Sequence, residues 1–164
     1  MLAIAALPRQ WLDTDTALEE PERCSVELAA IDEWLIDPRC STLRRAELLS
    51  VRKCVYETLH PGSRHGGAPG RAGGGKRPRG EGTSPAVRSH AADAAIRTGL
   101  SERSVRQLVQ IARDIPEPLR DLVRDTPLAT RQRELLHVAR ARRDPEEQHR
   151  RLGAALTRHC AGEP

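Results

Sequence analysis

Two short amphipathic helical patterns meet at a glycine within the twenty residues 91–110. Ala95 is small where two crossing helices would touch, and Gly99 stands where a turn between them requires a positive φ. Ser101 is suited to cap the second helix, and Glu102 favours the positive end of its dipole. We therefore predict a helix-turn-helix over these residues.

The second helix of this pair is predicted to bury one face and to expose the other. Its apolar residues recur at steps of three and four and face the small residues of the first helix. The inward set is Val105, Leu108, Val109 and Ala112, opposite Ala91, Ala94 and Ala95. The outward side chains can donate to phosphate oxygens or pair with base edges in a major groove. The candidate DNA-binding residues are Ser101, Glu102, Arg103, Arg106, Gln107, Gln110 and Arg113. A helical hairpin with solvated arginines would give the same short pattern.

Charge is distributed unevenly along the 164 residues, although the net charge is only +4. Residues 1–40 contain 9 acidic and 3 basic groups, whereas residues 61–90 contain 6 basic groups and 1 acidic group. Contact with a polyanion is therefore expected in the middle and C-terminal parts of the chain. Only Lys53 and Lys76 are lysines, and a GC-rich genome also produces such an excess of arginine. Composition by itself therefore does not establish binding to nucleic acid.

Residues 61–85 are predicted to be a disordered basic linker, because they contain nine glycines and four prolines and few apolar side chains. This linker would separate an N-terminal segment, 1–60, from a helix-turn-helix domain, 86–160. Its basic residues would add salt-sensitive DNA affinity as a flexible tether. Gly70, Gly75 and Lys76 match a phosphate-binding loop, but Arg77 replaces the hydroxyl residue that such a loop needs. We therefore predict no nucleotide site there.

Further helices are predicted on both sides of the linker. A helix through the apolar steps of 26–35 follows a short N-terminal strand, and a second helix over 41–59 is capped by Ser41 or Thr42. The charged side chains assigned to the exposed side of this second helix are Arg44, Arg45, Arg52 and Lys53. They either contact DNA phosphates or form a solvated helix face.

The C-terminal part is predicted to continue as a small all-helical unit. A short helix lies between Pro118 and Pro127, and a longer one covers 130–142. Asp144 caps a last helix, in which Pro145 is the first residue and Glu147 is at N3. The fold class is therefore mainly α: a multi-helical helix-turn-helix domain with a partial N-terminal segment.

No catalytic, cofactor or metal site is predicted. The four cysteines and six histidines show no metal-ligand spacing, and no Ser/His/Asp or Cys/His constellation is recognisable. The apolar run at the N-terminus is too short for a signal peptide or a membrane helix, so a cytoplasmic protein without a membrane partner is expected. The sequence therefore favours a binding protein over an enzyme.

Two groups of segments resemble the ParB family of plasmid and chromosome partition proteins, in particular its plasmid and phage members. The first group resembles the segment that leads from the family's N-terminal domain to its DNA-binding domain: AIDEWLI (30–36), TLRRAE (42–47) and RKCVYETLHP (52–61). The second resembles the family's central helix-turn-helix and the helices behind it: AADAA (91–95), TGLSERSV (98–105), VQIA (109–112), DTPLA (125–129) and ELL (134–136).

The resemblance implies a DNA-binding protein in plasmid maintenance or chromosome segregation. Ser101, Glu102, Arg103, Arg106 and Gln107 occupy positions that match the family's DNA-reading helix. Double-stranded DNA, a second copy of the chain and a partition ATPase are the partners it implies.

The chain also departs from the family pattern. The family's glycine- and arginine-rich phosphate motif has no counterpart before Ala30, so the chain resembles an N-terminally truncated member. Trp34 and Asp37 replace the Asn and Arg of the family's turn, so cytidine nucleotide binding and nuclease activity are not carried over. Two alternatives remain. One is an inactive interaction module that docks on a full-length relative or on the ATPase. The other is a nucleotide hydrolase or nuclease.

Overall fold

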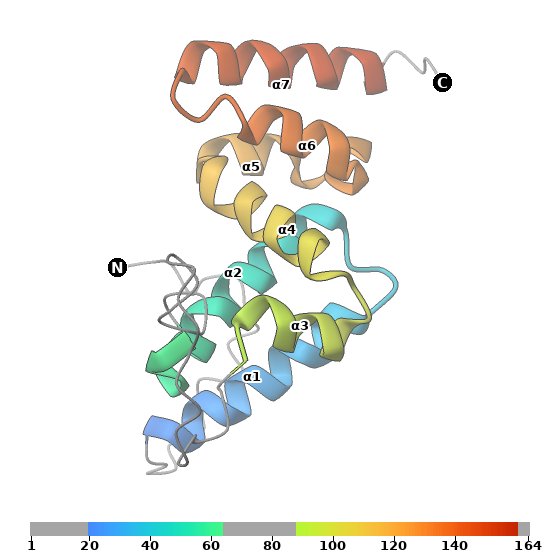
Figure 1. Ribbon diagram of the computed structural model, residues 1–164. Helices are drawn as coiled ribbons and strands as arrows, with labels where there is room; N and C mark the ends of the chain where they lie inside the picture. Colours follow the sequence, from blue (N-terminus) through green and yellow to red (C-terminus); the bar gives the residue numbers. More distant parts are fainter. Residues whose placement is uncertain (1–19, 64–87, 161–164) are drawn as a thin grey trace.

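The computed structural model describes residues 20–63 and 88–160, which form seven α-helices and two short 3-10 helices and contain no strand (Figure 1). The helices are α1 (Glu20–Ile36), α2 (Thr42–Leu59), α3 (His90–Thr98), α4 (Glu102–Asp114), α5 (Glu117–Arg124), α6 (Gln132–Ala139) and α7 (Pro145–Cys160), with 3-10 helices η2 (Pro61–Ser63) and η3 (Pro127–Thr130). The expectation of a mainly α fold is confirmed. The predicted N-terminal strand and nearly all of the predicted linker lie outside the described residues.

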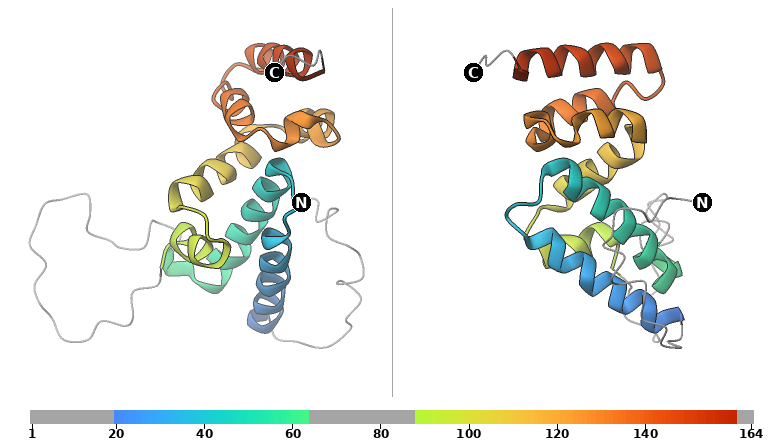
Figure 2. Two further views of the ribbon diagram at one scale, coloured as in Figure 1. Left: turned by 90° about the vertical axis from the view of Figure 1, so that its right-hand side faces the viewer. Right: turned by 180° about the vertical axis from the view of Figure 1, so that it is seen from behind.

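Helix α4 crosses the middle of the molecule (Figures 1 and 2). Helices α1, α2 and α3 lie toward one end, and α5, α6 and α7 lie toward the other. Helix α4 packs on α2, α3 and α6, and its most extensive contact is with α2. The helices before and after the predicted linker are therefore in direct contact. None of the helices in residues 20–63 and 88–160 combines the length and the hydrophobicity of a membrane-spanning segment.

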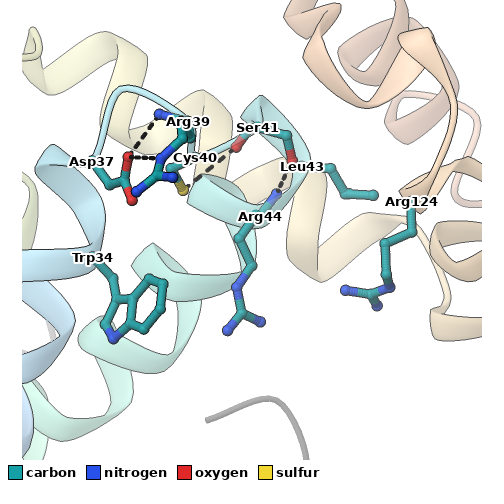
Figure 3. A pocket seen from close by; sticks show the side chains of 8 residues that line it. All are labelled: Trp34, Asp37, Arg39, Cys40, Ser41, Leu43, Arg44 and Arg124. Carbon is teal, nitrogen blue, oxygen red and sulfur yellow. Dashed lines mark hydrogen bonds and ion pairs between the residues drawn. The ribbon is translucent and has the colours of Figure 1, made fainter. Parts of the chain in front are cut away.

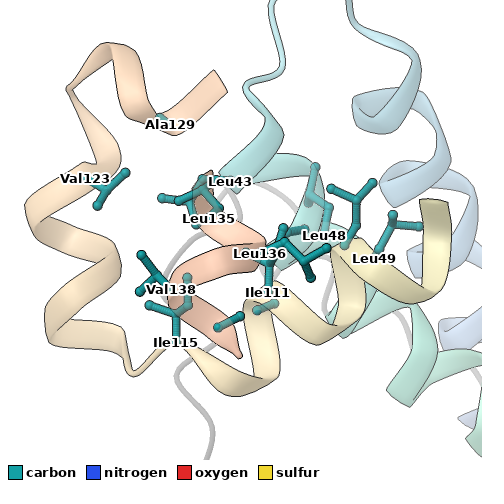
Figure 4. Close-up of a cluster of buried hydrophobic side chains, with 14 of the residues drawn as sticks. Leu43, Leu48, Leu49, Ile111, Ile115, Val123, Ala129, Leu135, Leu136 and Val138 are labelled. Carbon is teal, nitrogen blue, oxygen red and sulfur yellow. The ribbon is translucent and has the colours of Figure 1, made fainter. Parts of the chain in front are cut away.

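The core is aliphatic and runs through all of these helices. Figure 4 shows Leu43 and Leu49 of α2 in the same cluster as Ile111 of α4 and Leu135 of α6. The cluster continues to Ala155 of α7. Because apolar burial is the main stabilising term in folding, the two halves of the chain stabilise each other.

Arg52 of α2 is 1% exposed and is the largest of the completely buried side chains in the described part of the chain. Its Nε and Nη2 atoms donate to the Asp32 carboxylate of α1 at 2.7 and 3.2 Å, and Nη2 also donates to Asp93 of α3 at 2.7 Å. The prediction that Arg52 lies on the exposed face of its helix is wrong, because α3 covers this side of α2 and supplies the second carboxylate. A buried guanidinium needs such partners.

An aromatic cluster fixes the start of α3 beside Arg52. The Tyr56 hydroxyl donates to the carbonyl oxygen of Arg88 at 3.0 Å, and the His90 ring lies edge-on to Tyr56 with centroids 5.9 Å apart. Burial and the neighbouring Arg52 charge lower the pKa of His90 to about 4, so the imidazole is neutral at physiological pH.

The caps predicted for two helices are confirmed. The Ser41 hydroxyl accepts from the backbone N–H of Arg44 at 3.2 Å, and Asp144 Oδ1 accepts from Glu147 N at 3.0 Å. Helix α6 is shorter than the predicted 130–142, because the preceding residues form the 3-10 helix that starts at Pro127 and a turn follows Ala139. Proline at the start of a short helix is favourable, since it has no N–H to leave unpaired.

Candidate nucleic-acid interface

The turn between α3 and α4 depends on Gly99, whose φ of 71° and ψ of 5° are left-handed. Its backbone N–H donates to the carbonyl oxygen of Ala95 at 3.0 Å. Thr98 supports the same turn, because its hydroxyl donates to Ala94 O at 2.7 Å and accepts from Leu100 N at 3.4 Å. Glycine adopts this backbone conformation with less strain than any other residue, so the sequence determines where α3 ends.

Helix α4 begins directly after this turn. Ser101 has extended backbone angles, and its hydroxyl accepts from the N–H of Ser104 at 3.1 Å. Glu102 follows in the first turn, where a carboxylate favours the positive end of the helix dipole. The cap predicted for Ser101 is confirmed, so this hydroxyl serves the helix start as well as being a candidate DNA contact.

The buried face of α4 differs from the inward-facing set of residues predicted from the sequence. Val105, Leu108 and Ala112 are buried as expected, whereas Val109 is only half-buried. Ile111 is completely buried although it was not in the predicted set. The reason is that α4 packs on α2 and α6 as well as on α3, so three neighbours cover it instead of one.

The remaining face of α4 is open to solvent. Arg103, Arg106 and Arg113 are exposed and follow each other at helical spacing with the half-buried Gln110 between them. The side chains of Arg106 and Arg113 are 65% and 60% exposed. Arg106 pairs with Glu102 one turn earlier, whereas no described residue forms an ion pair or hydrogen bond with the Arg103 side chain. The charged side of α4 is therefore not covered by the described part of the chain.

The two predicted amide contacts are partly engaged within the protein. Gln107 is half-buried, and its Oε1 accepts from Gln132 Nε2 of α6 at 3.2 Å. Gln110 is also half-buried, and its amide helps to hold the pKa of the Asp114 carboxyl below its ordinary value. The seven candidates therefore do not form one uniform surface. The open part consists mainly of arginines.

Asp114, at the end of α4, connects this surface to the C-terminal helices. Its carboxylate is 3% exposed and accepts from Arg113 Nε at 2.7 Å and from Arg142 Nη1 at 3.3 Å. Burial alone would raise the pKa of Asp114, but the hydrogen bond and charge of Arg113, together with Arg142 and Gln110, hold it below its ordinary value. Sequence reasoning missed Asp114 and Arg142, because their contact joins residues 28 positions apart.

A second candidate site is an open hollow of about 430 Å³ between the end of α1, the start of α2 and α5 (Figure 3). Trp34 and Asp37 line it together with Arg39, Arg44 and Arg124. Each arginine has a carboxylate within reach, since Arg39 pairs with Asp37 at 3.6 Å and Glu47 accepts ion pairs from both other arginines. Each of these arginines therefore has a carboxylate partner within the protein, unlike Arg103.

Comparison with known proteins returned no match to any family model, curated protein or solved structure. Within residues 20–63 and 88–160, no group of three or more His, Cys, Asp or Glu side chains is arranged to hold a metal ion.

Proposed function

We propose that this protein binds double-stranded DNA, with α3 and α4 acting as a helix-turn-helix and α4 as the recognition helix. The observation that carries the proposal is the solvent exposure of three arginines on one face of α4, Arg103, Arg106 and Arg113. A recognition helix must be held firmly by its neighbours and must leave one polar face free for the major groove. Helix α4 meets both conditions, since three helices pack on it and its arginines remain exposed.

Arg103 and Arg106 are the residues that we propose to contact DNA most directly. Both lie in the N-terminal half of α4, the part of a recognition helix that approaches base edges. Arginine donates two hydrogen bonds to guanine or to a phosphate group. The Arg106–Glu102 pair is exposed and therefore weak, so Arg106 can exchange it for a DNA contact at little cost.

The biological setting follows from the sequence resemblance alone. Resemblance to ParB-like proteins makes plasmid partition or chromosome segregation the role we propose for this DNA binding, with a second copy of the chain and a partition ATPase as further partners. The alternative is an interaction module that docks through the segment ending at Asp37. Trp34 and Ile36 favour it, because they are 40% and 64% exposed there. Such a module would not retain duplex DNA.

The test is equilibrium binding of the full chain to a fluorescent duplex of mixed sequence, measured over a series of salt concentrations. The double variant Arg103→Ala/Arg106→Ala is expected to bind more weakly. Its slope of log K against log salt should be shallower by about 1 to 2, because each lost phosphate contact removes about one unit. Unchanged affinity and slope would mean that α4 does not touch DNA.

Arg150→Ala is the matched control. Arg150 is 71% exposed and pairs with Glu147 on its own helix, as Arg106 pairs with Glu102. It lies on α7, at the end of the molecule away from α3 (Figure 1). Removing it deletes one positive charge, half of what the α4 double variant loses, and the same kind of pair as that of Arg106, but should leave DNA binding nearly unchanged. A loss per removed charge as large as in the α4 variant would show that net charge alone explains the effect.

A further inference from the structure

The cluster around Asp114 combines one buried carboxylate with two exposed arginines from separate parts of the chain. Arg113 belongs to the last turn of α4, whereas Arg142 lies in the turn between α6 and α7. Their side chains are 60% and 50% exposed, while that of Asp114 is 3% exposed. Gln148 of α7 is also buried, and its amide donates to the Asp114 carbonyl oxygen at 2.8 Å. The end of α4 is thus held by both α7 and the turn before it.

Both arginines keep free hydrogen-bond donors after binding Asp114. A guanidinium has five N–H groups. Arg113 uses Nε and Nη2, and Arg142 uses Nη1. Arg113 Nε and Arg142 Nη1 donate to the same oxygen, Asp114 Oδ1, at 2.7 and 3.3 Å. The distance between the two nitrogens therefore cannot exceed the sum of these two lengths, so the guanidiniums are close to each other. No described residue accepts from Arg113 Nη1 or from Arg142 Nε and Nη2. Two adjacent guanidiniums therefore offer donors to solvent.

We propose that Arg113 and Arg142 form a clamp for one phosphate of the DNA backbone at the C-terminal end of α4, and that Asp114 is the positioning residue. The inference rests on the proposed DNA binding and adds Arg142 and Asp114 to it. One carboxylate between two arginines leaves a net charge of +1, which attracts an anion and outweighs the negative end of the helix dipole. Such a contact fixes the register of the helix on the duplex.

Asp114 is useful to this clamp although it is itself an anion. Arginine side chains lose much rotational freedom when they bind a phosphate group. Ion pairs to a buried carboxylate restrict both side chains before DNA arrives, so less of that freedom remains to be lost. Because α7 also holds this end of α4 through Gln148, the positions of the arginines depend on the C-terminal helices.

Asp114→Asn separates positioning from net charge, because the two effects have opposite signs. If Asp114 only repels phosphate, its neutralisation raises the positive charge of the surface and tightens binding to a mixed-sequence duplex. If Asp114 positions Arg113 and Arg142, the same change weakens binding several-fold. In the Arg113→Ala/Arg142→Ala background, Asp114→Asn should then have no further weakening effect, because Asp114 acts only through these arginines. Tighter binding by Asp114→Asn would overturn the positioning role.

Arg142→Ala tests the clamp independently, in case Asp114→Asn impairs folding. Arg142 is half-exposed, so its removal should leave the thermal unfolding of the chain nearly unchanged. We expect the salt slope of binding to the same duplex to become shallower by about 1 for Arg113→Ala and for Arg142→Ala. Arg143→Ala is the matched control, because Arg143 is an exposed neighbour with no partner among the described residues.

The outcomes distinguish failure of the clamp from failure of the proposed function. If Arg103→Ala/Arg106→Ala weakens binding but Arg142→Ala does not, α4 binds DNA and the clamp is absent. If Arg142→Ala and Arg143→Ala weaken binding equally, general surface charge explains the effect and there is no clamp. If neither the Arg103/Arg106 pair nor the Arg113/Arg142 pair matters, DNA binding through α4 itself is wrong.

Discussion

Gly99 is the one residue with a positive φ among those that the structure describes, and it stands where α3 turns toward α4. A Cβ atom at this position would meet no heavy atom within 4 Å apart from those of residue 99 and its two neighbours in the chain. Gly153 has equally open space around it, but it lies in α7 with an ordinary helical backbone. The same substitution at these two glycines therefore isolates the cost of the left-handed backbone.

Gly99→Ala is expected to lower the free energy of unfolding by about 1 to 2 kcal/mol, because an L-residue is strained in the left-handed region. Gly153→Ala is expected to raise it by about 1 kcal/mol, because alanine favours a helix interior over glycine. Urea denaturation followed by circular dichroism measures both changes. If Gly99→Ala were as stable as the unchanged protein, the turn would not depend on this glycine.

The role of a single residue could be predicted from the sequence where it depends only on adjacent positions in the chain. Gly99 and Ser101 were predictable because a turn and a cap depend only on adjacent residues. Arg52 was assigned to the wrong face because its partners, Asp32 and Asp93, lie 20 and 41 positions away. The contact of Gln107 with Gln132 was missed for the same reason.

The packing of α1, α2 and α3 depends on one shared ion-pair cluster, which is centred on Arg52. This arginine belongs to α2, while its two carboxylate partners belong to α1 and α3. Such an ion-pair cluster contributes little more to stability than apolar side chains in place of all its members would. Loss of one member, however, leaves the charges of the others without a partner. The cluster therefore makes the packing of α3 on α1 and α2 sensitive to a single residue.

Arg52→Met should lower the free energy of unfolding by about 3 kcal/mol, the lower end of the range for a broken buried ion pair, because Asp32 and Asp93 lose their shared partner but are partly exposed. Replacing both aspartates by Asn in the same chain should recover much of this loss, since no uncompensated charge is left. Chemical denaturation of the single and triple variants gives the comparison. A single variant as stable as the unchanged protein would show that this ion-pair cluster does not hold α3.

The helices themselves were largely predictable, whereas their packing was not. Caps and apolar spacing indicated α2, α4, α5 and α7, because these signals lie within each helix. The extensive contact between α2 and α4 had no such signal, since the chain that connects them in sequence includes the glycine-rich segment 61–85. Predicted domain limits followed composition, and composition does not say which helices share a core.

The molecule as a whole holds α4 between its two ends. Helices α1, α2 and α3 pack toward one end and α5, α6 and α7 toward the other, with one aliphatic core through both (Figures 1 and 4). This arrangement fixes the orientation of α4 while leaving Arg103, Arg106 and Arg113 exposed. A rigid helix with an open basic face is what a DNA-reading element needs.

The most direct measurement is a titration of the full chain with a mixed-sequence DNA duplex, followed by the chemical shifts of backbone amides in NMR spectra. If α4 binds DNA, the largest shift changes should occur at Arg103, Arg106 and Arg113, with little change around Arg150 on α7. Changes confined to another surface, or no changes at all, would contradict DNA binding through α4.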